Sequence, residues 1–314
     1  MTTIEVKSRS KSIKSYSSNE LTTDSLVEEL IDELSADNHL SKHRLRLTRL
    51  DQNGKQVPLV AHQTFAQNGI PKSETNIQLY VKDLGPQISW RTVFLVEYFG
   101  PFIFHPLFYF VQSLYNVPPF SHTKTQKLAY AIVLLHFAKR EYETLYVHKF
   151  SNATMPIFNI FKNSTHYWIL SGFNLAYFVY GPSFGYTGLM SFVFHVNELP
   201  SWVTYSLIAV WAFAEISNYK THKILSQIRD QDVKRYVIPH GYGFNLVSCP
   251  NYFFESLSWL VYALLVGNWA AWIFFFVSTG QMWLWAVKKH KRYLKTFGDD
   301  YKKLKRKVFI PYIL

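Results

Sequence analysis

Hydrophobic and polar positions divide the chain into two regions with unlike patterns. Up to about residue 85 the apolar residues recur at short intervals among many polar ones, whereas from Trp90 onward long apolar segments alternate with short polar connections. A helix that crosses a bilayer needs roughly 20 predominantly apolar residues. The second region, residues 86–314, therefore predicts an all-α bundle of about six transmembrane helices, at residues 90–112, 127–147, 166–184, 202–220, 253–267 and 268–287.

Three parts of this second region carry further signals. The last two predicted spans are separated only by Gly267-Asn268, so we expect them to form a tight helical hairpin. The span at 127–147 is the least apolar, because four charged residues interrupt it: Lys139, Arg140, Glu141 and Glu143. Charges at membrane depth are tolerated where they face a cavity or a partner. Residues 184–200 are either interfacial or a seventh span.

The first region, residues 1–85, has the patterns of a small α+β domain. Ile4–Val6 begins one strand, Leu45–Leu50 lies in another that reaches a favoured Asn53-Gly54 turn, and Ile77–Val81 alternates as the last. A helix with Ser25 and Glu28 as a capping box is predicted from apolar residues at helical spacing: Leu26, Val27, Leu30, Ile31 and Leu34. This order of elements resembles the ubiquitin-like β-grasp.

Charges and aromatic residues divide at the same boundary. Only Tyr16, Phe65 and Tyr80 precede residue 86, although aromatic residues make up 18% of the chain. Acidic and basic residues balance in the first region, so the second carries the whole formal net charge of +12. A segment so rich in aromatic residues buries too much apolar surface to remain disordered. The single cysteine, Cys249, excludes a framework of intrachain disulfides.

Basic residues gather after the last predicted span, where residues 288–307 hold ten Lys and Arg against two Asp. Such clusters just beyond an apolar segment mark its cytosolic end. No nucleic-acid-binding motif accompanies them, so nucleic acid is not expected as a partner. Met1–Lys14 contains no apolar signal segment, so the first span is expected to target the chain. We therefore expect both termini to face the cytosol, which fits an even number of spans.

The stretch from Glu215 to Glu255 contains the strongest polar feature of the second region. Asn218, His222 and Arg229 follow one another at helical spacing, so a polar face continues out of a span and ends in basic residues. Such a face suits a phosphorylated cofactor that enters from the cytosol. An ordinary membrane–water boundary has the same composition, and the residues alone leave both interpretations open. The Gly241-x-Gly243 pair lacks the context of a dinucleotide-binding motif.

Other polar residues of the predicted spans are candidates for chemistry. Glu97 is a lone carboxylate within an apolar span, and burying it without compensation is expensive. Arg140, Glu143 and His148 predict either an internal salt-bridge network or part of a site, and both alternatives remain open. No pair of histidines has a convincing metal-ligand context, so no metal is expected. Three further histidines are expected at the membrane interface: His105, His166 and His195.

Short motifs in a fixed order carry a family resemblance over nearly the whole chain. These motifs are Lys82-Asp83-Leu84-Gly85, Gln87-Ile88-Ser89-Trp90, Glu97-Tyr98, Gly100-Pro101, Lys139-Arg140, Glu143-Thr144-Leu145, Val147-His148, Phe150-Ser151, Thr154-Met155-Pro156, Asn159-Ile160-Phe161-Lys162-Asn163, Val247-Ser248-Cys249-Pro250-Asn251-Tyr252, Glu255, Lys289-His290 and Tyr293-Leu294-Lys295. In this order and spacing the chain resembles the very-long-chain trans-2-enoyl-CoA reductases of the endoplasmic reticulum, within the wider steroid 5α-reductase family. The N-terminal ubiquitin-like domain is typical of that branch.

The resemblance implies a multi-pass membrane enzyme of the endoplasmic reticulum that uses NADPH to saturate the 2,3 double bond of a long-chain trans-2-enoyl-CoA. This is the last step of each fatty-acid elongation round, so the other enzymes of that cycle are implied as partners. The reductive site of the family maps onto Tyr252, as proton donor, and Glu97. The cofactor site maps onto Asn218, His222, Arg229, Asn251, Glu255, His290 and Tyr293. His222 stands where the steroid reductases carry a carboxylate.

Three other functions compete with this one. A steroid or polyprenol double-bond reductase would keep the fold and change the substrate, although the N-terminal domain and Asn251-Tyr252 argue against it. A membrane methyltransferase also places a basic tail after a helical hairpin. A non-catalytic membrane adaptor would use its ubiquitin-like domain to recruit partners, but it leaves Glu97 and the polar face that ends at Arg229 unexplained.

Overall fold

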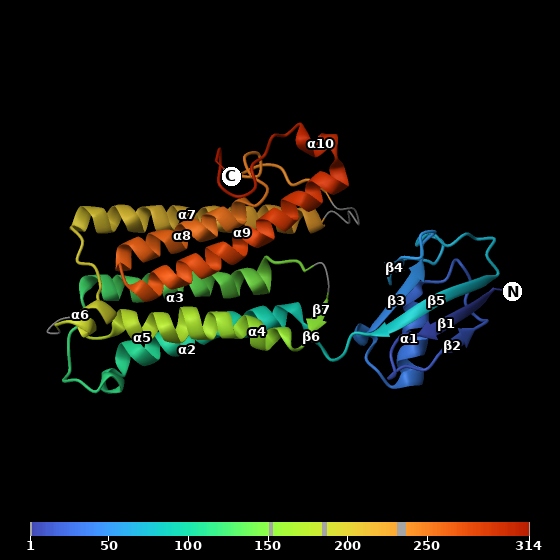
Figure 1. Cartoon of the computed structure of the whole chain (residues 1–314), viewed down its shortest axis with the longest axis horizontal. Coiled ribbons are helices and arrows are strands. Elements are labelled where there is room, and N and C mark those ends of the chain that lie inside the picture. The colour runs from blue at the N-terminus through green and yellow to red at the C-terminus, as the bar shows by residue number, and fades with distance from the viewer. Residues whose placement is uncertain (1, 151–152, 184–186, 231–236, 314) are drawn as a thin grey trace. The chain divides into compact units, whose positions relative to one another are not determined.

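The computed structural model describes residues 2–150, 153–183, 187–230 and 237–313, with the side chains of 229 and 230 outside that description. Two compact units can be distinguished by their internal contacts. The sheet unit comprises residues 1–90 and 152–159, and the helical unit comprises residues 91–151 and 160–314. Figure 1 shows the strands of the first unit and the long helices of the second.

The sheet unit contains a five-stranded sheet in the order β2-β1-β5-β3-β4. The central strands β1 and β5 run parallel, and the other neighbours are antiparallel. A separate pair joins β6 to β7. The elements of this unit are β1 (Thr3–Ser8), β2 (Tyr16–Ser18), α1 (Val27–Asn38), η1 (Lys42–Arg44), β3 (Leu45–Leu50), β4 (Gln56–Pro58), β5 (Asn76–Asp83), β6 (Gln87–Ser89) and β7 (Thr154–Pro156). The predicted α+β character of this region is confirmed.

The helix α1 covers one face of this sheet with its apolar stripe. Leu30 and Leu34 are fully buried, in one core with Ile4, Leu79 and Phe65. Alternation along β5 buries every second residue, because successive side chains of a strand point to opposite faces. The core of the unit is therefore apolar.

The predicted capping box at the start of α1 is wrong. The N-cap residue is Leu26, which makes no side-chain cap, and Ser25 instead accepts a hydrogen bond from the backbone of Thr22 at 3.2 Å. The free N–H groups of the first turn are satisfied by a neighbouring segment, since Val27 donates to the Gln63 carbonyl at 3.0 Å. Contacts distant in sequence thus replace the local cap.

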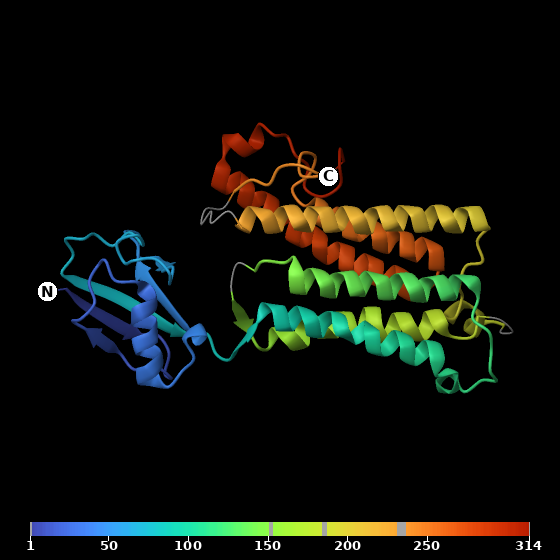
Figure 2. The same ribbon diagram turned by 180° about the vertical axis from the view of Figure 1, so that it is seen from behind.

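The helical unit is a bundle of long helices that lie side by side in both views (Figures 1 and 2). Each of the six predicted spans coincides with a long helical segment. The helices are α2 (Trp90–Phe110), η2 (Gln112–Tyr115), α3 (Lys124–Tyr146), α4 (Asn159–Thr165), η3 (His166–Asn174), α5 (Leu175–Tyr180), α6 (Leu189–Val193), α7 (Ser201–Asp230), α8 (Pro250–Val266), α9 (Trp269–Phe297) and α10 (Asp299–Lys302).

Two helices among the described residues are long and apolar enough to cross a membrane by composition alone. They are α2 and α9, each with a mean hydropathy of 1.4 in its most apolar window. A seventh span at 184–200 is not formed, because the described part of that stretch contains only the five-residue helix α6. Five helical residues extend about 7.5 Å, far less than the thickness of a bilayer.

The predicted helical hairpin at Gly267-Asn268 is confirmed. Gly267 ends α8 with a φ of 70°, a conformation that costs glycine little. Asn268 caps α9 by accepting a hydrogen bond from the Ala270 backbone at 2.9 Å, and its amide nitrogen donates to the His195 carbonyl at 2.8 Å. These bonds fix the turn between two helices that pack against each other.

The rod formed by α4, η3 and α5 contains a π-helix in its middle, the nine-residue segment η3. Trp168 of this segment donates from Nε1 to the Val96 carbonyl of α2 at 2.8 Å. Its ring also occupies the space that a side chain at Gly100 would fill, so α2 and η3 approach closely only because that position is glycine.

Candidate functional site

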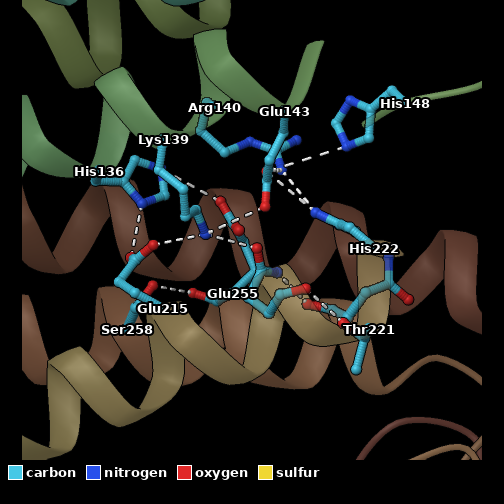
Figure 3. Close-up of polar contacts among 12 residues, drawn as sticks. His136, Lys139, Arg140, Glu143, His148, Glu215, Thr221, His222, Glu255 and Ser258 are labelled. Atoms are coloured by element: carbon cyan, nitrogen blue, oxygen red, sulfur yellow. Dashed lines mark hydrogen bonds and ion pairs between the residues drawn. The ribbon is translucent and has the colours of Figure 1, made fainter. Parts of the chain in front are cut away.

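The charged residues of α3 face α7 and α8 in the interior of the bundle (Figure 3). Positions 136, 139, 140 and 143 lie on one side of α3, because side chains three and four residues apart share a helix face. Positions 215, 218 and 222 do the same on α7. The sequence left a network or a site open for Arg140, Glu143 and His148, and the structure contains an extensive network.

One half of this network connects α3 to the middle of α7. His136 Nδ1 lies 2.8 Å from Glu215 Oε1, and Lys139 Nζ lies 2.6 Å from Glu215 Oε2. Lys139 also donates to Asn218 Oδ1 at 2.7 Å. On its other side, His136 Nε2 lies 3.4 Å from Glu255 Oε1 of α8. Four charged or titratable groups from three helices are therefore linked, and Lys139 connects them to Asn218.

The other half is centred on Arg140. Its Nη1 donates to Glu143 Oε2 at 2.6 Å, and its Nη2 donates to the hydroxyl of Tyr98 on α2 at 2.7 Å. His222 Nδ1 lies 3.1 Å from Glu143 Oε2 and 3.2 Å from Arg140 Nη1. Arg140, Glu143 and His222 are all buried. Buried charges are stable only when paired, which explains how an otherwise apolar helix retains them.

Glu143, His148 and His222 form a group whose potential ligand atoms all lie within 4.8 Å of one another. The Arg140 guanidinium already binds the Glu143 carboxylate, so a divalent cation at this place would meet a fixed positive charge. His148 follows the end of α3, and burial, with the nearby Arg140, lowers the pKa of its ring to about 2. The residues fit an ion-pair network better than a metal centre.

Three of the predicted site residues lie on the first turns of α8. Asn251 accepts a hydrogen bond at its carbonyl from Asn218 Nδ2 at 2.9 Å, while its side-chain oxygen Oδ1 is buried with no hydrogen-bond partner among the described residues. Glu255 Oε2 is likewise buried and without a partner there. The ring of Tyr252 lies 6.2 Å from that of Trp285, and no hydrogen bond to its hydroxyl is found within the described residues.

The predicted catalytic pair does not meet directly. Glu97, on α2, is 2% exposed, and its Oε1 atom has no hydrogen-bond partner among the described residues. No hydrogen bond or ring contact in the described part of the chain joins Glu97 to Tyr252. Arg140 reaches this part of α2 through its hydrogen bond to the hydroxyl of Tyr98, the residue that follows Glu97.

The remaining predicted cofactor residues lie elsewhere. His290 Nδ1 contacts Ser248 Oγ at 2.6 Å, and the same Oγ lies 2.6 Å from the Tyr301 hydroxyl. The Tyr293 ring stacks on that of Tyr301 with 5.1 Å between centroids. Arg229 belongs to the last turn of α7, and its side chain lies outside the described residues. Asn218, His222, Asn251 and Glu255 are thus brought together, and His290 and Tyr293 form a second cluster.

Several members of this arrangement were not predicted from the sequence. His136, Lys139, Glu215 and Tyr98 were not chosen, although the spacing of polar residues along 136–143 and 215–222 carried the signal. The ring of His105 is fully buried among the helices, 2.6 Å from the Tyr180 hydroxyl and 2.7 Å from the Ser171 carbonyl. Its partners are distant in sequence, so spacing along one helix could not have shown them.

The chain is similar to known proteins over nearly its whole length. The sequence model of a family described as 3-oxo-5-alpha-steroid 4-dehydrogenase matches residues 153–314. A putative enoyl reductase of Schizosaccharomyces pombe is 45% identical, with 99% of each chain covered. A very-long-chain enoyl-CoA reductase of Dictyostelium discoideum is 38% identical over 97% of this chain and 96% of its own. A probable very-long-chain enoyl-CoA reductase of Caenorhabditis elegans is 36% identical over 88% and 89%.

Proposed function

The chain belongs to the steroid 5α-reductase family, and on that premise we propose that it is a very-long-chain enoyl-CoA reductase. It is an oxidoreductase that saturates the 2,3 double bond of a long-chain trans-2-enoyl-CoA, with NADPH as the reductant. Full-length similarity to proteins named enoyl-CoA reductase supports this substrate class over a steroid. The reaction ends each round of fatty-acid elongation, so the other enzymes of that cycle are the proposed partners.

One observation carries the proposal: beside the buried ion pairs, α2 and α8 carry buried polar atoms that make no hydrogen bond among the described residues. Glu97 Oε1, Asn251 Oδ1 and Glu255 Oε2 are buried with no hydrogen-bond partner among the described residues. More than about 90% of buried polar groups in proteins are hydrogen-bonded. Buried polar atoms without a hydrogen-bond partner are expected where a bound polar ligand supplies the missing partners. A non-catalytic adaptor would need none of them.

We assign NADPH to the residues of α7 and α8 that line this interior. Asn251 Oδ1 and Glu255 Oε2 are acceptors, which suit the amide and hydroxyl donors of a nicotinamide nucleotide. Asn218 donates a hydrogen bond to the Asn251 carbonyl, and His222, one turn further along α7, contacts Glu143. Arg229, His290 and Tyr293 are proposed for the rest of the cofactor, with Arg229 on a phosphate. These residues fit NADPH, which supplies the hydride that reaches Cβ of the substrate.

Tyr252 and Glu97 are proposed as the catalytic residues. Charge develops on the thioester oxygen during reduction, and Cα needs a proton. The Tyr252 hydroxyl carries a proton at neutral pH and has no partner in the described chain, so it can donate to the substrate. Glu97, which does not contact Tyr252, is proposed to bond the thioester carbonyl. Arg140 stabilises negative charge on either side chain.

We also propose the cellular setting of the chain. Six spans, both termini in the cytosol and residence in the endoplasmic reticulum fit the apolar helices and the basic residues after α9. The domains are residues 1–85, ubiquitin-like, and residues 86–314, which carry the reductase. The strand order β2-β1-β5-β3-β4, with a parallel central pair and one covering helix, supports a β-grasp for the first.

The test is NADPH oxidation by the purified full-length protein in detergent. We expect turnover with a long-chain trans-2-enoyl-CoA and none with the matched saturated acyl-CoA. A steroid enone at the same concentration is the competing substrate. Turnover of the steroid alone would replace the proposed substrate class, and turnover of neither would remove the proposed activity.

A further inference from the structure

The last residues of the chain return to the helical unit after α10. Lys305 has a φ of 48°, a rare conformation for a residue other than glycine, and the chain turns there. Lys307 then pairs with Val247 in a parallel bridge. Ser248 N donates to the Lys307 carbonyl at 2.8 Å, and Lys307 N donates to the Leu246 carbonyl at 2.9 Å. Figures 1 and 2 show the C-terminal segment beside the loop that precedes α8.

Arg306 is the polar anchor of this segment. It is only 6% exposed, whereas the side chains of Lys302 and Lys303 in the same basic tail are 64% and 76% exposed. Its Nη1 donates to the Pro239 carbonyl at 2.7 Å, and its Nη2 lies 3.1 Å from His240 Nδ1. Burying a guanidinium is expensive. The burial of Arg306, in a tail whose lysines are exposed, indicates that its contacts with Pro239 and His240 are structurally important.

Phe309 is the apolar anchor. Its side chain is buried in a cluster with Cys249, Met282 and Ala286, and Tyr252 packs against the same cluster. The Trp283 ring meets Phe309 edge to face at 5.9 Å between centroids. Residues 304–310 therefore contact both ends of the 239–249 loop, the middle of α9 and the neighbours of Tyr252.

We infer that residues 304–310, the C-terminal strap, position the hydroxyl of Tyr252 by holding the 239–249 loop and the start of α8 against α9. The inference rests on the proposed function, in which Tyr252 is the proton donor. The Tyr252 hydroxyl makes no hydrogen bond within the described residues, so packing alone fixes the ring. Misplacing a catalytic group by about 1 Å costs up to roughly a hundredfold in rate. Arg306 is a positioning residue, since it acts through the strap.

Cys249 can report whether the C-terminal strap is in place. It is the single cysteine of the chain, and it is fully buried beneath Phe309. Burial raises the pKa of the Cys249 thiol to about 11, so little reactive thiolate is present at neutral pH. A strap that loosens exposes this thiol. Alkylation of Cys249 by a maleimide therefore measures the strap without reference to any substrate.

The experiment compares Arg306→Met with Lys303→Met in the full-length protein in detergent. Both changes remove one positive charge from the tail, but only Arg306 is buried. For Arg306→Met we expect Cys249 labelling at least about tenfold faster, kcat at least about tenfold lower, and a KM for NADPH within about twofold of the original protein. Lys303→Met is expected to change neither labelling nor kcat.

Two results overturn the inference. Labelling of Cys249 at the original rate in Arg306→Met would mean that the strap does not depend on this anchor. Faster labelling with unchanged kcat would mean that the strap does not position Tyr252. If Arg306→Met does not fold, Phe309→Ala removes the apolar anchor and is judged by the same two results. An original protein that fails to reduce the enoyl-CoA overturns the proposed function instead, and Cys249 labelling still decides whether Arg306 holds the strap.

Discussion

The sheet unit and the helical unit place their charges in opposite ways. The sheet unit has an apolar core, and its strongest ion pair, Arg44 with Asp83 at 2.6 Å, lies at the edge of that core. The helical unit buries Arg140, Glu143 and Glu215 completely or nearly so. Paired buried charges contribute little net stability compared with apolar residues of the same size. The charges of the helical unit are therefore costly to bury, which agrees with the ligand-binding role proposed for this interior.

The largest effect is expected from Tyr252→Phe, which removes one hydroxyl from the proposed site in the helical unit. General acid catalysis contributes typically about 10²–10⁴-fold, so we expect kcat to fall by that factor. The dissociation constant of NADPH is expected to stay within about twofold, because the lost interaction forms mainly in the transition state. Single-turnover NADPH oxidation together with NADPH binding measures both quantities. Near-original turnover would remove Tyr252 from the proposed role.

Arg140→Met tests how strongly the stability of the helical unit depends on its buried ion pairs. The change leaves Glu143 and His222 without their cation, and removing one partner of a buried pair costs about 3–5 kcal/mol. We expect a large loss of thermal stability in detergent. Lys127→Met, on an exposed position of the same helix, is the matched control and should change stability by less than about 0.5 kcal/mol. Equal effects of the two changes would contradict the contrast between buried and exposed charge.

Arg229→Ala tests the cofactor end of the polar face on α7. A charge-assisted hydrogen bond contributes about 1.5–3 kcal/mol, which corresponds to roughly a ten- to hundredfold weaker NADPH affinity. Equilibrium binding of NADPH to the purified protein measures the change. Unchanged affinity in a folded variant would place the phosphate elsewhere.

The smallest effect is expected in the sheet unit. The hydrogen bond from Arg44 lowers the pKa of Asp83 to about 2. A lowered folded-state pKa stabilises the fold above the unfolded pKa of about 3.9, and that contribution is lost as the pH falls from about 4 toward 2. Because Arg44 is partly exposed, the contribution is about 1–2 kcal/mol. Hydrogen exchange of β5 amides between pH 3 and pH 6 measures it.

Asp83→Asn should weaken β5 at pH 6 and flatten this pH dependence. Asp24→Asn is the control, because the Asp24–Lys72 pair is about two-thirds exposed and should contribute almost nothing. A pH dependence that persists in Asp83→Asn would assign it to another group.

Periodicity along the chain predicted the helices well and the site only in part. Apolar runs report local burial, so all six helical segments and the Gly267-Asn268 hairpin could be predicted from sequence. The contacts between Lys139 and Glu215, and between Arg140 and Tyr98, join residues more than forty positions apart. Spacing on one helix shows that such residues share a face, but not which helix they meet. The predicted Ser25–Glu28 capping box failed for the same reason, because the first turn of α1 is satisfied by residues distant in sequence.

The π-helix η3 has a consequence for how homologous sequences should be aligned. A deletion of one residue between 166 and 174 would restore ordinary α-helical register and turn the preceding part of the rod by about 100° relative to α5. Trp168 would then leave the space beside Gly100. A single gap between 166 and 174 in an aligned sequence therefore marks a change in how this rod packs against α2.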